Sequence, residues 1–116
     1  MDKFELEVIN HLRELKVPAH LRGYEYIKTA LNCLREDPDI IWAITKELYP
    51  AVAEKFNILK PQRVERGIRH ALTFVYMDLV VLKKVLGTSS RLTNGEFLAT
   101  LHEVIRVKMA GEHFEL

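Results

Sequence analysis

Apolar residues recur at steps of three and four along most of the chain, a spacing that predicts amphipathic helices. The first helix is predicted from Phe4, Val8, Leu12 and Leu15. The second, over about 24–35, is predicted from Tyr24, Ile27, Leu31 and Leu34. Pro18 and Gly23 lie between the two patterns, where both residues are typical of an interruption.

Turn and cap residues predict two further helices in the middle of the chain. Asp37 can cap a third helix and Pro38 can open it, since proline is tolerated in a first helical turn. Its apolar residues are Ile40, Ile41, Ile44 and Leu48. A short fourth helix is predicted over 50–56, and Asn57 tolerates the left-handed conformation that ends a helix. The residues after it therefore indicate a tight, ordered turn.

Three more helices are predicted in the remaining sequence. The fifth covers about 61–76, and the sixth is capped by Asp78 and stopped by Gly87. The seventh begins with capping-box spacing of Thr93 and Glu96, with Leu92 and Phe97 placed to form a hydrophobic staple, and runs to about Met109. No strand pattern of useful length is present. The predicted fold is an all-α, single-domain helical bundle over residues 1–116.

The fifth helix divides into an apolar and a polar face. At about 100° per residue, one arc holds the apolar residues, which are Val64, Gly67, Ile68, Ala71, Leu72 and Val75. Gly67 and Ala71 would allow a neighbouring helix to approach closely. The opposite arc holds Gln62, Arg66, Arg69, His70 and Thr73, flanked by Arg63 and Glu65.

A short helix, a turn and a longer helix with one apolar face form the helix-turn-helix layout, predicted here at about 50–76. In that layout the second helix enters the major groove of DNA. Arginine can bind guanine bidentately and glutamate can accept from cytosine. Lys60 and the N–H groups of 61–64 would meet phosphate. The pattern alone leaves a second reading open, because such arginines also occur on solvated helix faces and Glu65–Arg69 is an ordinary i,i+4 pair.

Composition narrows the classes of function. The chain has 116 residues, of which 48% are apolar, and a formal net charge of +1. This near-neutral balance means that DNA binding would rest on local charge. Cys33 is the single cysteine, so no internal disulfide can form. The first residues carry Asp2, Glu5 and Glu7 in place of an apolar signal segment, and no apolar run is long enough to span a bilayer. We expect a soluble, cytoplasmic protein.

Other candidate chemistry is weak. The five histidines, His11, His20, His70, His102 and His113, lack metal-ligand spacing, so no metal site is expected. We interpret His70 as facing DNA and His102 as a surface residue. Cys33 is interpreted as a packing residue, and Trp42 and Tyr49 as core or rim aromatics. No glycine-rich phosphate loop is present. We therefore expect no cofactor and no enzymatic activity.

The amino-acid sequence in the middle of the chain resembles that of a known family. "ITKELYPAVAEKFN" followed by "RVERGIRHAL" resembles the DNA-binding effector domain of the sporulation initiation response regulator, stage-zero sporulation protein A. The similarity extends back through "VPAHLRGYEYIKTAL" and forward to "LTNGEF", covering roughly residues 10 to 108.

The resemblance implies a six-helix, all-α domain of the response-regulator effector class, related to winged-helix proteins but without a sheet. It also implies a helix-turn-helix that reads a TGTCGAA-like box, often as tandem copies bound by two domains. Carried over by position, the DNA-contacting residues are Arg63, Glu65, Arg66, Arg69 and His70. We add Gln62 and Thr73 from the helical wheel. Expected partners are double-stranded DNA, a second copy on tandem boxes and the sigma subunit of RNA polymerase.

Two departures from the family pattern limit what carries over. Full-length members have an N-terminal receiver domain, and 116 residues leave no room for one, so the chain is either a trimmed effector domain or a short homologue. The segment between the fifth helix and "LTNGEF" is several residues shorter than the family pattern. DNA binding thus carries over better than transcriptional activation. The alternative function is a protein-binding modulator or competitor of the full-length regulator.

Overall fold

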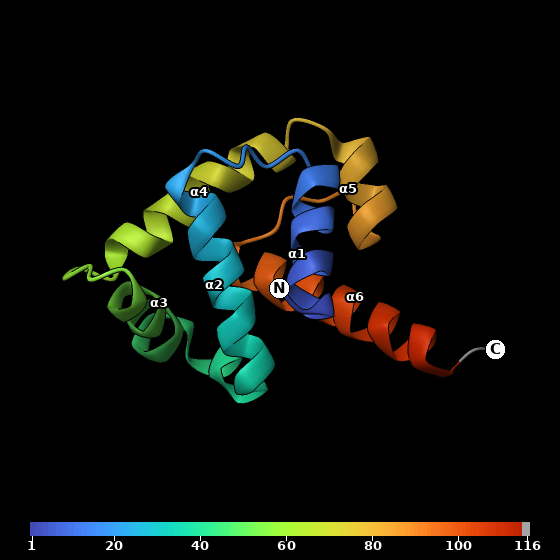
Figure 1. Cartoon of the computed structure of the whole chain (residues 1–116). Helices are drawn as coiled ribbons and strands as arrows, with labels where there is room; N and C mark the ends of the chain where they lie inside the picture. The colour runs from blue at the N-terminus through green and yellow to red at the C-terminus, as the bar shows by residue number, and fades with distance from the viewer. Residues whose placement is uncertain (115–116) are drawn as a thin grey trace.

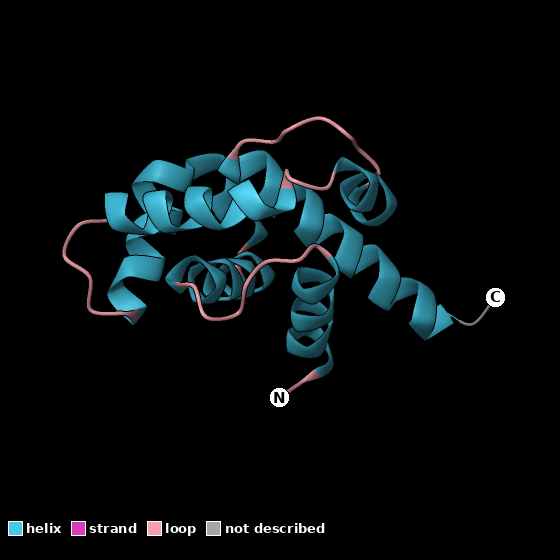
Figure 2. Cartoon of the chain, turned by 90° about the horizontal axis from the view of Figure 1, so that it is seen from above, coloured by secondary structure: helices cyan, strands magenta, loops and turns pink. Residues whose placement is uncertain are grey.

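The computed structural model describes residues 1–114, with side chains through 112, and this part of the chain is helical without any strand. Its α-helices are α1 (Lys3–Glu14), α2 (Arg22–Glu36), α3 (Tyr49–Lys55), α4 (Gln62–Val75), α5 (Leu79–Leu86) and α6 (Asn94–Phe114). The predicted all-α fold is confirmed. Short loops join the helices, and the C-terminal part of α6 extends beyond the others in both views (Figures 1 and 2).

The predicted third helix differs from expectation. Asp37 caps it and Pro38 opens it as predicted, but it forms a 3-10 helix, η1 (Pro38–Ala43), and then a π-helix, η2 (Ile44–Leu48). The two elements are joined at Ala43, whose φ of −138° and ψ of 54° are not helical. Ile41 lines a groove with residues of α6, and Ile44 packs against Gly95.

This geometry explains the position of Trp42. A side chain next to Ile41 on a 3-10 helix is rotated by about 120° from the packed side. Trp42 is accordingly 86% exposed, so its interpretation as a core or rim residue is wrong. Tyr49 and Cys33 are buried, as predicted.

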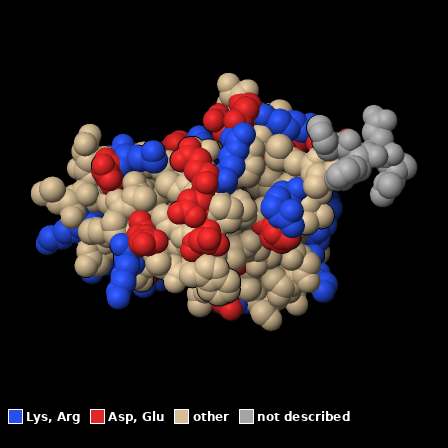
Figure 3. Space-filling view, turned by 90° about the horizontal axis from the view of Figure 1, so that it is seen from below, with Lys and Arg blue, Asp and Glu red and all other residues tan. Residues whose placement is uncertain are grey.

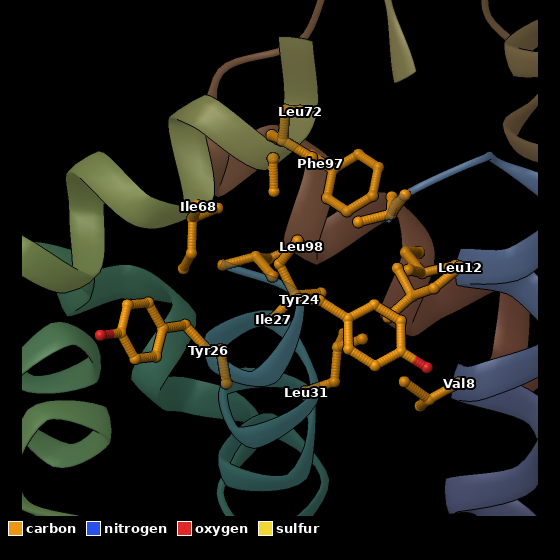
Figure 4. Packing of buried hydrophobic residues seen from close by; sticks show 14 of the residues in the cluster. Val8, Leu12, Tyr24, Tyr26, Ile27, Leu31, Ile68, Leu72, Phe97 and Leu98 are labelled. Carbon is orange, nitrogen blue, oxygen red and sulfur yellow. The ribbon is translucent and has the colours of Figure 1, made fainter. Parts of the chain in front are cut away.

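The core forms around α2. Tyr24, Ile27 and Leu31 of α2 meet residues of three other helices (Figure 4). These partners are Val8 and Leu12 of α1, Ile68 and Leu72 of α4, and Phe97 and Leu98 of α6. All are buried, so α4 is fixed to the domain by its apolar face.

Two glycines set the distance between α2 and α4. A Cβ added at Gly23 would lie 2.0 Å from the Gly67 carbonyl oxygen and 2.9 Å from the Ala71 Cβ. No L side chain fits in that space, so the two helix backbones touch directly. The predicted role of Gly67 and Ala71 in a close helix approach is confirmed.

The last helices begin and end largely as predicted. Thr93 and Glu96 form both bonds of a capping box, Thr93 N–H to Glu96 Oε1 at 2.9 Å and Glu96 N–H to Thr93 Oγ1 at 3.1 Å. Asp78 caps α5, and Gly87 ends it with φ of 79°. α6 continues past the predicted end at Met109 to Phe114.

Ion pairs join the C-terminal half of α6 to α1. Lys3 pairs with Glu112 at 3.2 Å, and Lys108 pairs with Glu7 at 2.8 Å. The Glu7 side chain is buried, and the His11 Nδ1 lies 2.7 Å from the Glu7 carbonyl oxygen. The face seen from below, opposite α4, intermixes acidic and basic side chains (Figure 3).

Candidate nucleic-acid interface

The turn between α3 and α4 is a Schellman motif. Asn57 has the left-handed φ of 55°. The Ile58 N–H donates to the Ala53 carbonyl at 2.9 Å, and the Asn57 N–H donates to the Glu54 carbonyl at 3.2 Å. These bonds satisfy the last carbonyls of α3 and fix the direction in which the chain leaves it. The predicted ordered turn is confirmed, and α3, the turn and α4 form a helix-turn-helix unit.

The first turn of α4 corrects one expectation. The Arg63 N–H donates to the Lys60 carbonyl and the Val64 N–H to the Pro61 carbonyl, both at 3.0 Å. Pro61 has no N–H. Within residues 1–114, this leaves the Gln62 N–H as the one group of 61–64 without a backbone acceptor. The prediction of several free N–H groups was wrong because tight i→i−3 bonds occupy them.

The inner face of α4 is buried as predicted. Val64, Ile68, Ala71, Leu72 and Val75 are each at most 1% exposed. Because this stripe is held in the core, the opposite side of the helix must face solvent. The fold thereby fixes which side chains of α4 are presented to a ligand.

The structure brings the predicted contact residues together on that outer side. Gln62, Arg63, Arg66, Arg69, His70 and Thr73 are exposed, as is Lys60 in the preceding turn, while Glu65 is half-buried. Arg63, Arg66 and Lys60 line one shallow cleft beside the turn. None of these three cations pairs with a carboxylate of the described residues, so their charge is available to an anionic ligand.

Arg69 and Glu65 behave differently. The Arg69 guanidinium pairs with Glu65 Oε1 at 2.9 Å. On the same flank, the Asn94 side-chain amide donates to the Glu65 carbonyl at 3.0 Å and to the Tyr49 hydroxyl at 3.2 Å. Asn94 thus joins α6 to both helices of the helix-turn-helix. Sequence reasoning missed this role, since Asn94 was seen only as part of a capping segment and its partners lie far away in sequence.

Two polar residues farther along α4 have contacts within the helix. The Thr73 hydroxyl donates to the His70 carbonyl at 2.6 Å, so toward a ligand this hydroxyl can act as an acceptor. The His70 ring meets the Phe74 ring edge-on, with centroids 5.7 Å apart. Both side chains remain exposed beside Arg66 and Arg69.

Comparison with known families decides the class of this helix-turn-helix. The sequence matches the family described as the C-terminal domain of the sporulation initiation factor Spo0A over residues 8–105. The chain belongs to this family. The match includes α3, the turn and α4 in full. Domains of the Spo0A C-terminal family bind DNA in the regulation of sporulation, and the family is regulatory rather than enzymatic.

Within the part of the chain that the structure describes, the remaining candidates do not form a second site. Within the described residues, no group of three or more His, Cys, Asp or Glu side chains is placed to hold a metal ion. In that same part of the chain, no helix has the length and apolar character needed to cross a membrane. His102 is half-buried against Phe4 rather than at the surface, and burial lowers its pKa. His113 lies outside the residues whose side chains are described.

Proposed function

We propose that this domain reads a TGTCGAA-like box in double-stranded DNA through the outer face of α4. The observation that carries the proposal is the pair Arg63 and Arg66, which are exposed, have no carboxylate partner among the described residues and lie on a helix whose other face is buried. If the outer face of α4 served only the fold, carboxylates placed beside these arginines would stabilise it. A major groove lined by guanine acceptors and flanked by phosphates would complement them.

Each residue has a role that follows from its chemistry. Arg63, Arg66 and Arg69 can meet guanine O6 and N7 with two N–H donors, and Glu65 can accept from the cytosine amino group. His70, Gln62 and Thr73 lie beside them and offer further base or backbone contacts. Lys60 precedes the helix and suits phosphate. On DNA, Arg69 would exchange part of its bond with Glu65 for a bond to a base.

The test compares variants on a duplex with one box and on a scrambled duplex of equal length. Arg66→Ala and Arg69→Ala should each weaken box binding by about 1–3 kcal/mol and reduce discrimination between the duplexes. Lys60→Ala should weaken both duplexes equally and reduce the salt dependence of binding. If neither arginine variant changed box preference, α4 would not be the reading helix.

We also propose that two copies bind tandem boxes cooperatively. A net charge of +1 gives little non-specific attraction, so one copy should bind one box weakly and the free protein should be monomeric or weakly associating. Neighbouring copies raise each other's effective concentration. Residues 86–91 and the last helix, with Arg106 and Lys108, are the proposed contact surface, although both cations take part in intramolecular ion pairs.

Rotating the second box by about half a helical turn tests this pairing. Cooperative binding to in-phase boxes and independent binding to out-of-phase boxes is the expected result. Equal affinity for both arrangements would contradict pairing.

In the cell, we propose that the domain acts on the nucleoid in the cytoplasm, with the polymerase sigma subunit as a further partner. If the unsubstituted domain bound a full-length regulator but did not bind the box, the result would instead support the competitor function.

A further inference from the structure

A second groove runs along the other flank of α4, away from the turn. It is lined by Arg69 and Thr73 of α4, by Tyr76 directly after α4 and, across from them, by the segment 91–95. Residues 91–93 belong to the connection between α5 and α6, and residues 94–95 begin α6. The basic residue of this segment is Arg91, which is exposed. The sequence patterns assigned Arg91 no role in binding DNA.

Two sets of contacts hold this segment beside α4. The Tyr76 hydroxyl donates to the Leu92 carbonyl at 2.6 Å, and the Arg91 guanidinium carbon lies 5.8 Å from the centre of the Tyr76 ring. Burial raises the pKa of Tyr76, which keeps the hydroxyl protonated as a donor. Two residues later, Asn94 binds the Glu65 carbonyl at 3.0 Å. Arg91 therefore directly precedes a segment that is attached to α4 at two points, Leu92 and Asn94.

The charge of Arg91 lies over the Tyr76 ring but is not neutralised by a carboxylate within the described residues. No carboxylate there forms an ion pair with it, in contrast to Arg69, which pairs with Glu65. The nearby Glu96 carboxylate accepts from the Thr93 N–H in the capping box. On this flank of α4, Arg91 is thus the cation that remains available to an anion.

A helix in the major groove has a phosphate backbone on each side. Lys60 and Arg63 lie on the flank of α4 that continues into the turn, whereas Arg91 lies across the opposite flank. We propose that Arg91 binds a backbone phosphate of the strand on this second side, so that the two flanks hold α4 between both strands. This inference rests on the proposed use of α4 as the reading helix. It assigns Arg91 a positioning contact without sequence preference.

The experiment measures binding to a duplex with one box, which removes any contribution from a second copy. Arg91→Ala should lower affinity roughly threefold to tenfold for box and scrambled duplexes alike, and should reduce the slope of log affinity against log salt by about one. Arg91→Lys should retain most of the slope, because a lysine also neutralises a phosphate. Thermal unfolding followed by circular dichroism should match the unsubstituted protein.

Arg106→Ala is the matched control, since it also removes one exposed arginine and its proposed contact with a second copy cannot form on a duplex with one box. Arg106 lines a groove with Leu34 and Pro38 at the C-terminal end of α2, whereas α4 crosses α2 at Gly23 near the other end. Its removal should leave both affinity and salt slope unchanged. An equal effect of Arg106→Ala and Arg91→Ala would mean that net charge alone matters, and would overturn the proposal.

Other results separate this inference from the proposed function. Unchanged affinity and slope in Arg91→Ala, together with weakened box binding in Arg66→Ala, would overturn the Arg91 contact and leave α4 as the reading helix. Loss of box preference in Arg91→Ala, with scrambled binding unchanged, would indicate base contact and also overturn it. If Arg66→Ala, Arg69→Ala and Arg91→Ala all had no effect, both proposals would fail.

Discussion

Two regions of the molecule display several lysines and arginines, and they differ in how these charges are used. On the C-terminal half of α6, Arg106 binds Glu103 through two bonds of 3.0 and 2.6 Å, and Lys108 pairs with the buried Glu7. On α4, Arg63 and Arg66 have no carboxylate partner within the described residues. Similar residue types therefore stabilise the fold in one region and remain available to a ligand in the other.

The difference teaches that a basic helix is not by itself a DNA-binding helix. Lys108 pairs with Glu7 of α1, which lies far away in the sequence, so this ion pair forms only once the chain folds. Arg69 is an intermediate case, exposed yet paired with Glu65 one turn earlier. The arrangement of carboxylates, rather than the number of cations, distinguishes the two regions.

Displacing α4 from α2 should have the largest effect. In Gly23→Ala the added methyl would overlap the Gly67 carbonyl, and relief requires the helices to separate. We expect a loss of about 3 kcal/mol in the free energy of unfolding, measured by urea denaturation, and a loss of box binding. The α1–α6 ion pairs would not be touched directly.

Gly111→Ala is the matched control on α6. A Cβ there meets no atom within 4 Å, and alanine is the better helix former. We expect it to raise the free energy of unfolding by up to about 1 kcal/mol without changing DNA affinity. Equal stability of Gly23→Ala and the unsubstituted protein would contradict the direct backbone contact between α2 and α4.

Breaking the α6 ion pair should come next in size. Lys108→Met leaves the buried Glu7 carboxylate without its cation, which we expect to cost about 1–3 kcal/mol in unfolding free energy. Adding Glu7→Gln should recover part of this loss, because the buried charge is then gone. Affinity for one box should remain unchanged in the folded protein. A weakened affinity would show that Lys108 serves DNA as well as the fold.

Removing the carboxylate of Glu65 should increase the difference between α4, with cations that are unpaired within the described residues, and α6, with paired ones. Glu65→Gln releases Arg69 from its ion pair and removes a negative charge near the proposed phosphate positions. We expect scrambled-duplex affinity to rise by about 0.5–1 kcal/mol, with poorer discrimination of the box. Fluorescence anisotropy with both duplexes measures this. Reduced affinity for both would instead assign Glu65 a structural role.

The smallest expected effect concerns pH. Burial against Phe4 lowers the pKa of His102 below its ordinary value of 6.5. Below that value the unfolded chain binds the proton more readily than the folded chain, so the free energy of unfolding falls as the pH decreases through this window. His102→Gln should remove this part of the pH dependence, and the exposed His20→Gln should not. Unfolding midpoints measured above and below pH 6.5 would decide it.

Much of α4 could be predicted because its determinants are local. The 3.6-residue spacing alone identified the buried stripe of α4. The residues that begin or end the other helices, Thr93, Asp78, Asn57 and Gly87, likewise act within a few residues of their own positions. The exposed side of α4 follows directly from the buried one. The predicted contacts of Arg63, Glu65, Arg66, Arg69 and His70 with DNA remain predictions.

What could not be predicted depends on distant or subtle geometry. Glu7 and Lys108 are 101 residues apart in the sequence, and nothing near either one indicates its partner. The partners of Asn94 and Arg91 are likewise set by how the segment before α6 folds back onto α4. The same run of apolar residues can form a 3-10, a π or an α turn. The exposure of Trp42 therefore depends on a small change in helical winding. Periodicity cannot resolve that change.

The contact between Gly23 and Gly67 has a consequence for how this domain could acquire new binding preferences. Since α4 is held by its buried face and by the backbone contact with α2, exposed side chains such as Arg63 and Arg66, which form no ion pair within the described residues, do not hold it in place. The residues facing outward can be exchanged without repacking the interior. Under the proposed use of α4 as the reading helix, foldability and target choice would be encoded by separate sets of positions on one helix, and the domain would be a suitable scaffold for retargeting to other DNA sequences.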